Sequence, residues 1–192
     1  MKIVCLGDSI TFGYGVARHR CWTALAREVT GHTIINAGIS GDTTAGMLSR
    51  FDRDVLREAP DVLMLLGGTN DLMNGCPEGV VKSNVTAMMQ QARAANIQTM
   101  LGTLPPLYES RMPEAWRTMQ EFRAPESDYE AHRYWQRAFT ATYELVLVDF
   151  YGRLKSLSDA EPGAYFGDGV HPTARGHRVM ADAFIEGLRR LR

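Results

Sequence analysis

Short runs of apolar residues alternate along this chain with longer stretches in which apolar residues recur at helical spacing. The runs occupy residues 2–7, 32–36, 61–66, 97–102 and 145–149. Continuous apolar runs of this length are typical of strands that are buried on both faces of a sheet. The helical spacing predicts helices over residues 18–29, 43–58, 78–95 and 173–190. This alternation predicts an α/β fold in which a five-stranded parallel sheet forms the middle of a three-layer α/β/α sandwich.

The segment 103–143 interrupts the alternation. Its first half contains several prolines and is predicted to be an irregular loop, and its second half is predicted to be a helix. A long loop beside the carboxyl ends of strands often forms a lid or a wall of a substrate site. An aromatic-rich packing arm, for example at a dimer contact, fits the same residues equally well. We expect residues 1–192 to form one domain, with this segment as an insertion near the active-site edge.

Charge and composition restrict the class of partner. The 21 basic and 22 acidic residues leave no basic excess, which argues against a nucleic-acid partner. No stretch approaches the ~20 apolar residues of a membrane span. The first strand is predicted to begin at residue 2, so no signal peptide is expected within this sequence, and a signal removed from a longer precursor stays an open alternative. The three cysteines lack CxxC spacing. We therefore expect a cytoplasmic protein with a small-molecule substrate and without a metal. The sequence leaves open whether the protein forms a homo-oligomer.

Polar residues and glycines follow three of the predicted strands and precede the last helix. They occupy residues 7–9, 36–42, 67–71 and 168–172. Ligands of open parallel sheets bind outside the carboxyl ends of the strands. These four segments are therefore the first candidates for a functional site.

Three residues in these segments have the chemistry of a serine nucleophile and its base. The hydroxyl of Ser9 is a poor nucleophile until a base removes its proton. His171 is a suitable base, and Asp168 precedes it by three residues in a turn. That spacing lets the carboxylate hold one ring nitrogen while the other nitrogen faces Ser9.

Acyl transfer also requires N–H donors for the negative charge that develops on the carbonyl oxygen. Gly41 can present its backbone N–H from a tight loop, and Asn70 can present its side-chain amide. The backbone N–H of Ser9 is a third candidate donor. Together these residues supply every role that acyl transfer needs.

Several neighbouring residues receive other interpretations. Asp42 and Asp71 are interpreted as residues that shape their loops, and Arg50 as a surface or ion-pairing residue. Phe12 and Tyr14 follow Ser9 closely, and they either line an acyl pocket or cover the core.

Each candidate, taken singly, has a common structural explanation. A Gly-Asp-Ser turn is often only a strand exit, Asn70 could cap a helix, and a single histidine near a helix start is more often structural. The prediction of a catalytic site depends on all of them occurring in order, at one edge of the sheet, with complementary roles.

At this point the chain resembles the SGNH hydrolases, also called the GDSL esterase and lipase family. The resemblance covers residues 3 to about 177, and Ile10 stands where the GDSL block has leucine. The family's four blocks are matched in order by GDSI (7–10), SGDT (40–43), GGTND (67–71) and DGVHP (168–172). Four ordered blocks are a specific signal, whereas one alone is weak.

The resemblance implies roles for particular residues. The nucleophile of the family matches Ser9, its base matches His171 and its acid matches Asp168. Its oxyanion-hole residues match Gly41 and Asn70. The resemblance also implies a flavodoxin-like fold and chemistry that needs neither a metal nor an organic cofactor.

The expected function is that of a serine esterase, which hydrolyses carboxylic esters through an acyl-enzyme intermediate. Short-chain or acetyl esters are the expected substrates, and a lysophospholipase or thioesterase of the same family is the alternative. A metal-dependent phosphoesterase could use Asp8, Asn70 and His171, but the chain lacks the further His/Asp pairs of a two-metal site. A flavodoxin-like binding module without catalysis is the remaining alternative, and the chain contains no GxxxxGK[ST] phosphate loop.

Overall fold

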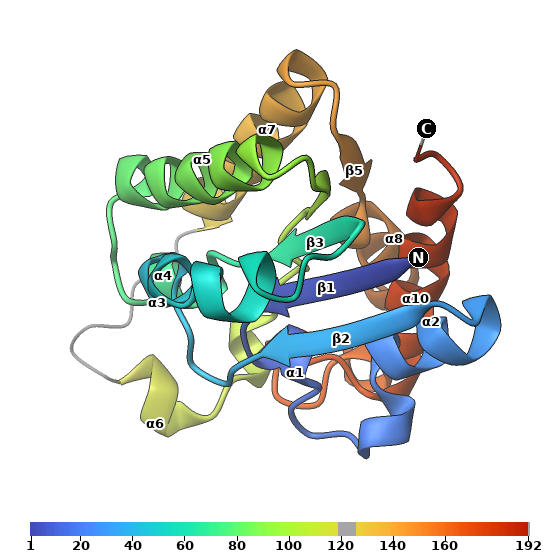
Figure 1. Cartoon of the computed structure of the whole chain (residues 1–192). Coiled ribbons are helices and arrows are strands. Elements are labelled where there is room, and N and C mark those ends of the chain that lie inside the picture. Colours follow the sequence, from blue (N-terminus) through green and yellow to red (C-terminus); the bar gives the residue numbers. More distant parts are fainter. Residues whose placement is uncertain (119–125, 192) are drawn as a thin grey trace.

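The structure is a computed structural model that describes residues 1–118 and 126–191, with a parallel sheet at its centre (Figure 1). The five strands are β1 (Lys2–Gly7), β2 (Thr33–Gly38), β3 (Val62–Leu66), β4 (Gln98–Gly102) and β5 (Val146–Val148). Neighbouring strands are parallel and lie in the order β2-β1-β3-β4-β5. The predicted α/β/α sandwich is confirmed, and this strand order is that of the flavodoxin-like folds.

Side chains along the central strands alternate between two apolar layers. In β1, Ile3 and Cys5 belong to one layer, whereas Val4 and Leu6 belong to the other. All four side chains are buried. Because both faces of the strand are covered, its sequence is a continuous apolar run rather than an alternation of apolar and polar residues.

Helices cover both faces of the sheet (Figure 1). The layer that contains Ile3 is covered by α2 (Trp22–Thr30), α8 (Phe150–Ser158) and α10 (Ala174–Leu188). The opposite layer is covered by α3 (Thr44–Ser49), α5 (Glu78–Ala94) and α7 (Glu126–Thr142). Shorter helices are α1 (Ser9–Phe12), α4 (Thr69–Met73), α6 (Glu114–Arg117) and α9 (Pro162–Tyr165).

Two predicted helices are divided in the structure. The helix expected over 43–58 consists of α3 and a π-helical turn over Asp52–Leu56, with Arg50 at the junction at φ −103° and ψ 6°. The helix expected over 18–29 consists of a 3₁₀ turn over Arg18–Arg20 and then α2, because Cys21 between them is extended. The helix α8 was not predicted. It begins where the side chain of Asp149 accepts a hydrogen bond from the N–H of Gly152.

The segment 103–143 contains more helix than its sequence predicts. The expected helix in its second half is present as α7. Its first half contains a 3₁₀ turn over Glu109–Arg111 and the short helix α6. The part of the predicted loop over 119–125 lies outside the described residues. In the described part of the chain, none of the helices has the length and apolar character needed to cross a membrane.

Candidate active site

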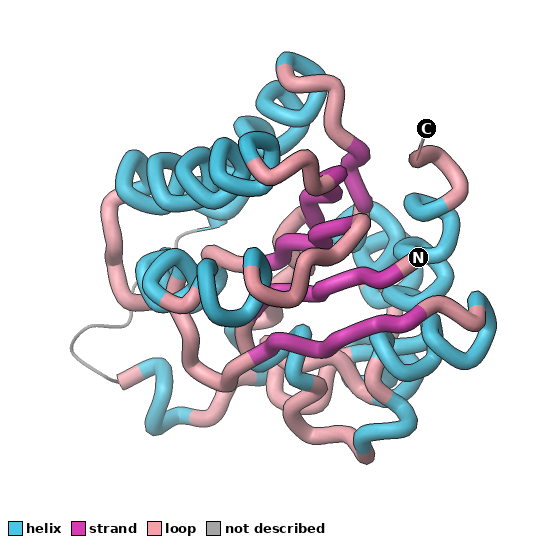
Figure 2. The backbone as a smooth tube through the Cα atoms, viewed as in Figure 1, coloured by secondary structure: helices cyan, strands magenta, loops and turns pink. Residues whose placement is uncertain are grey.

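The loops that leave the carboxyl ends of β1, β2 and β3 lie at the same edge of the sheet, where these parallel strands end (Figure 2). At the end of β1, Asp8 caps the first turn of α1, because its side chain accepts a hydrogen bond from the N–H of Ile10 at 2.9 Å. Ser9 is therefore the first residue of a helical turn. The preceding Gly7 has no room for a side chain, since an added Cβ would lie 2.6 Å from the carbonyl oxygen of Leu66.

Ser9, His171 and Asp168 form a continuous row of hydrogen bonds. The Nε2 of His171 lies 2.8 Å from the Oγ of Ser9, and its Nδ1 lies 2.7 Å from the Oδ2 of Asp168. When Nδ1 carries the proton, Nε2 is free to accept the hydroxyl proton of Ser9. The structure thus brings these three predicted residues together across a separation of 162 positions.

The carboxylate of Asp168 is held by its own turn. Its Oδ1 accepts hydrogen bonds from the backbone N–H groups of Val170 and His171 at 3.0 and 2.8 Å. Burial alone raises the pKa of Asp168, but the hydrogen bonds from His171 and Val170 outweigh burial and lower it. Asp168 therefore stays ionised and can hold one tautomer of the His171 ring.

A hydrogen bond joins α4, which carries Asn70, to the loop that carries Gly41. Asn70 belongs to α4, and its Nδ2 donates a hydrogen bond of 2.8 Å to the carbonyl oxygen of Asp42. Gly41 directly precedes Asp42 and has a φ of +79°, in the left-handed region that favours glycine. The amide of Asn70 has a second N–H, which this bond does not use. The two predicted donors are thus carried by neighbouring turns.

A buried ion pair connects the loops after β1 and β2. Arg50 is only 7% exposed, and its Nε lies 2.8 Å from the Oδ2 of Asp42. Its NH2 group donates to the carbonyl oxygen of Gly7, and its NH1 group pairs with Asp54 at 2.7 Å. The ion-pairing interpretation of Arg50 is correct and the surface interpretation is wrong. The i,i+4 spacing of Arg50 and Asp54 is a sequence signal for one pair, but nothing local predicts the contact with Gly7.

Asp71 holds the loop after β3 against α3. Its carboxylate accepts hydrogen bonds from the backbone N–H of Thr44 at 2.9 Å and from the hydroxyl of Thr44 at 2.6 Å. The prediction that Asp42 and Asp71 shape their loops is confirmed by the pairing of Asp42 with Arg50 and by the bonds of Asp71 to Thr44.

Two aromatic rings border His171, and the sequence did not predict this arrangement. The ring of Tyr14 lies 4.5 Å from the His171 ring, and the ring of Trp116 in α6 lies 6.0 Å from it in an edge-on orientation. Tyr14 is 47% exposed, and Phe12 is exposed as well. Neither Phe12 nor Tyr14 covers the core, so that alternative is wrong.

Two other histidines are fully buried and serve as packing residues. Burial first, and then the positive charge of Lys82 and Arg133, lower the pKa of His132 to about 4. Burial, with His171 as a smaller cause, lowers the pKa of His177 to about 4. Both rings are therefore neutral at neutral pH. Among the described residues, no group of three or more His, Cys, Asp or Glu side chains is placed to hold a metal ion.

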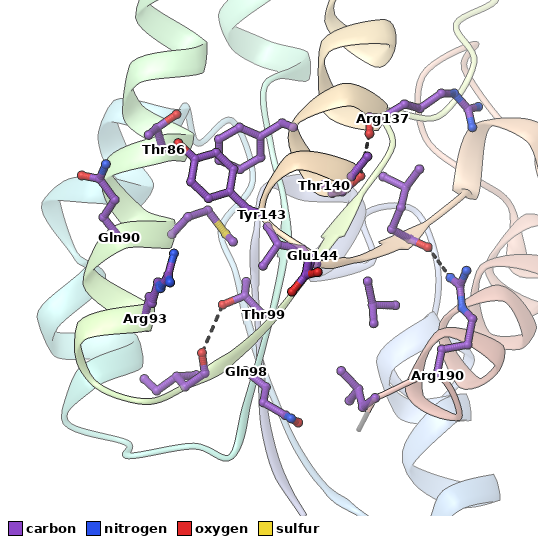
Figure 3. Close-up of a pocket in the computed structure, with 18 of the residues that line it drawn as sticks. Thr86, Gln90, Arg93, Gln98, Thr99, Arg137, Thr140, Tyr143, Glu144 and Arg190 are labelled. Atoms are coloured by element: carbon purple, nitrogen blue, oxygen red, sulfur yellow. Dashed lines mark hydrogen bonds between the residues drawn. The ribbon is translucent and has the colours of Figure 1, made fainter.

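A separate hollow of about 980 Å³ lies at the opposite edge of the sheet (Figure 3). It is formed by the carboxyl ends of α5 and α7 and by the amino ends of β4 and β5, with Arg93, Thr99, Tyr143 and Glu144 among its lining residues. This hollow is distinct from the surroundings of Ser9 and His171, since other elements line it.

Comparisons with known proteins identify the family of the chain and relatives of the same fold. Residues 5–179 match the model of the GDSL-like lipase/acylhydrolase family. An arylesterase from Vibrio mimicus is 33% identical over 117 residues, which span 57% of this chain and 58% of that protein. The esterase TesA from Pseudomonas aeruginosa is 29% identical over 88% of this chain and 79% of that protein. A crystal structure of a lipolytic G-D-S-L family protein from Veillonella parvula has a TM-score of 0.84, at 25% identity over 100% of both chains.

Proposed function

The chain belongs to the GDSL-like lipase/acylhydrolase family, and we propose that Ser9, His171 and Asp168 perform its ester hydrolysis. The observation that carries this proposal is the row of hydrogen bonds from Asp168 through His171 to Ser9, at 2.7 and 2.8 Å. Both distances lie within the range in which a base can take a proton from a hydroxyl. The roles are those of nucleophile for Ser9, base for His171 and orienting acid for Asp168.

The reaction proceeds through an acyl-serine. The Oγ of Ser9 forms a bond to the acyl carbon while its proton passes to the Nε2 of His171. His171 then gives that proton to the leaving oxygen as the ester bond breaks. In the second half, His171 takes a proton from water, the water oxygen attacks the acyl carbon, and Ser9 leaves with the proton returned. Asp168 stabilises the imidazolium that forms in each half.

The negative charge on the carbonyl oxygen is stabilised by three N–H donors. They are the second side-chain N–H of Asn70, the backbone N–H of Gly41 and the backbone N–H of Ser9. The bond between Asn70 and the carbonyl oxygen of Asp42 supports this role, because it fixes the amide next to the turn of Gly41. A donor that is already fixed needs no reorganisation when the charge develops.

The proposed substrates are carboxylic esters with acetyl or other short acyl groups. The names of the Vibrio and Pseudomonas relatives, arylesterase and esterase, support esters as the substrate class. A rate series on p-nitrophenyl esters of increasing acyl length measures the preference directly. We expect kcat/KM to be highest for the acetyl and butyryl esters, and a maximum at long acyl chains would contradict this part of the proposal.

The catalytic assignment is tested with a fluorophosphonate probe, which labels activated serines. Ser9→Ala should abolish both labelling and esterase activity while the protein keeps its fold. Ser83→Ala is the matched control, because Ser83 is exposed on α5 and its hydroxyl donates to the carbonyl oxygen of Gly79 within the same helix. Undiminished labelling of the Ser9→Ala variant would overturn the assignment of the nucleophile.

A further inference from the structure

The two aromatic rings beside His171 come from segments that lie far apart in the sequence. Tyr14 lies two residues after the end of α1, and Trp116 lies in α6, within the segment whose role the sequence left open. Their ring centroids lie 4.5 and 6.0 Å from that of His171. Tyr14 is exposed and Trp116 is half-buried, so both rings keep surface that a bound molecule can reach.

The segment that carries Trp116 is attached to the turn between Asp168 and His171. The backbone N–H of Tyr108 donates a hydrogen bond of 2.8 Å to the carbonyl oxygen of Gly169. Met112 is buried, and both its backbone and its side chain lie close to the same glycine. These contacts hold the start of the segment that carries Trp116 beside the turn of His171.

The chemistry of the reaction tells which part of a substrate these rings can touch. This step rests on the proposed function. His171 passes its proton from Nε2 to the leaving oxygen, so the alcohol portion of the ester must lie beside the His171 ring. The carbonyl oxygen points instead toward the donors of Asn70 and Gly41. Tyr14 and Trp116 consequently face the alcohol portion rather than the carbonyl oxygen.

We propose that Tyr14 and Trp116 select esters whose alcohol portion contains a ring with an apolar face. Aryl groups and pyranose sugars share this feature, and both stack on aromatic side chains. A hollow of about 410 Å³ continues from Tyr14 and His171. It is lined by Val16, His19 and Arg20 among others, and it offers room for the remainder of the alcohol portion.

The test compares three acetates of primary alcohols, whose leaving oxygens are chemically similar. They are benzyl acetate with an aryl ring, methyl 6-O-acetyl-glucopyranoside with a sugar ring, and butyl acetate without a ring. Trp116→Ala should lower kcat/KM about fivefold to tenfold for at least one ring ester, mainly through a higher KM. Butyl acetate should change less than twofold. The ring ester whose kcat/KM falls shows whether the site prefers an aryl ring or a sugar ring.

Conservative and control variants separate ring binding from support of His171. Trp116→Phe should keep most of the ring preference, and Tyr14→Leu should reduce it as Trp116→Ala does. Tyr143→Ala is the matched control, since Tyr143 is 44% exposed in the distant hollow of Figure 3 and should leave all three rates unchanged.

Two results would overturn the proposal. One is an equal loss for all three acetates in Trp116→Ala, which means that Trp116 acts only through His171. The other is no loss for either ring ester in Trp116→Ala and Tyr14→Leu. The proposed function fails on a different observation, namely labelling of the protein by the fluorophosphonate probe that does not depend on Ser9.

Discussion

The guanidinium of Arg50 lies 2.8 Å from the carboxylate of Asp42, and both side chains are largely buried. Arg50 also donates to the carbonyl oxygen of Gly7, two residues before Ser9, while Asp42 directly follows Gly41. One buried ion pair thus links the turn of the proposed nucleophile to the turn of a proposed oxyanion donor. The relative position of these two turns depends on Arg50.

Replacing Arg50 should therefore affect both stability and activity. Arg50→Met leaves Asp42 buried without its partner, and we expect a loss of roughly 3 kcal/mol in the free energy of unfolding. The kcat for ester hydrolysis should fall as well. Urea unfolding and initial rates measure the two effects. Arg57→Met is the control, because Arg57 and Asp52 form an exposed pair that contributes little. Equal stability of the two variants would contradict the role of Arg50.

Removing the amide of Asn70 should reduce catalysis more than folding. For Asn70→Ala we expect kcat to fall by roughly 10²–10³ with a small change in KM, since an oxyanion donor acts mainly in the transition state. The lost bond to the carbonyl oxygen of Asp42 should cost roughly 1 kcal/mol of stability. Steady-state kinetics and thermal melts distinguish the two effects. A variant with the kcat of the wild type excludes Asn70 from the oxyanion hole.

Gly169 should not tolerate a side chain. Its φ is +85°, and an added Cβ would lie 2.3 Å from the carbonyl oxygen of Tyr108. Gly169→Ala should therefore destabilise the protein and displace the turn that carries His171. Gly31→Ala is the matched control, because Gly31 has a φ of +67° but open space at its Cβ position. We expect the free energy of unfolding to fall by roughly 2 kcal/mol more in Gly169→Ala than in the control. Denaturant unfolding of both variants measures this difference.

The buried ring of His132 should make the protein sensitive to acid. The pKa of His132 is about 4 in the folded state and roughly 6.5 in the unfolded chain. The unfolded state therefore binds the proton more readily, and the stability that is present above pH 6.5 declines as the pH falls toward 4. Between pH 7 and pH 5, the free energy of unfolding should fall by roughly 2 kcal/mol less for His132→Phe than for the wild type.

The control for this effect is His19→Gln, because His19 is exposed. Denaturant unfolding at pH 7 and pH 5 is the measurement for all three proteins. The control should keep the acid sensitivity of the wild type. If His132→Phe loses as much stability as the wild type over this interval, another group is responsible for the acid sensitivity.

The sequence by itself determined the strands, the class of fold and the residues with the chemistry for acyl transfer. Strand positions could be predicted because burial on both faces produces continuous apolar runs, which are a local property of the chain. The pairing of Asp168 with His171 could also be predicted, because three residues of one turn separate them. The α/β topology then places the ends of parallel strands at one edge of the sheet, which brought Ser9, Gly41 and Asn70 into consideration.

Only the tertiary structure decided the contacts between distant segments. The burial of Arg50 depends on the carbonyl oxygen of Gly7 and on Asp42, and the division of the predicted 43–58 helix occurs at this same residue. Trp116 lies beside His171, and the hydrogen bond between Tyr108 and Gly169 joins its segment to the turn of His171. The apolar pattern of a sequence predicts which positions are buried, but it does not predict which residue from a distant segment contacts a given side chain. For that reason the reaction could be predicted from the sequence, whereas the surroundings of His171 could not.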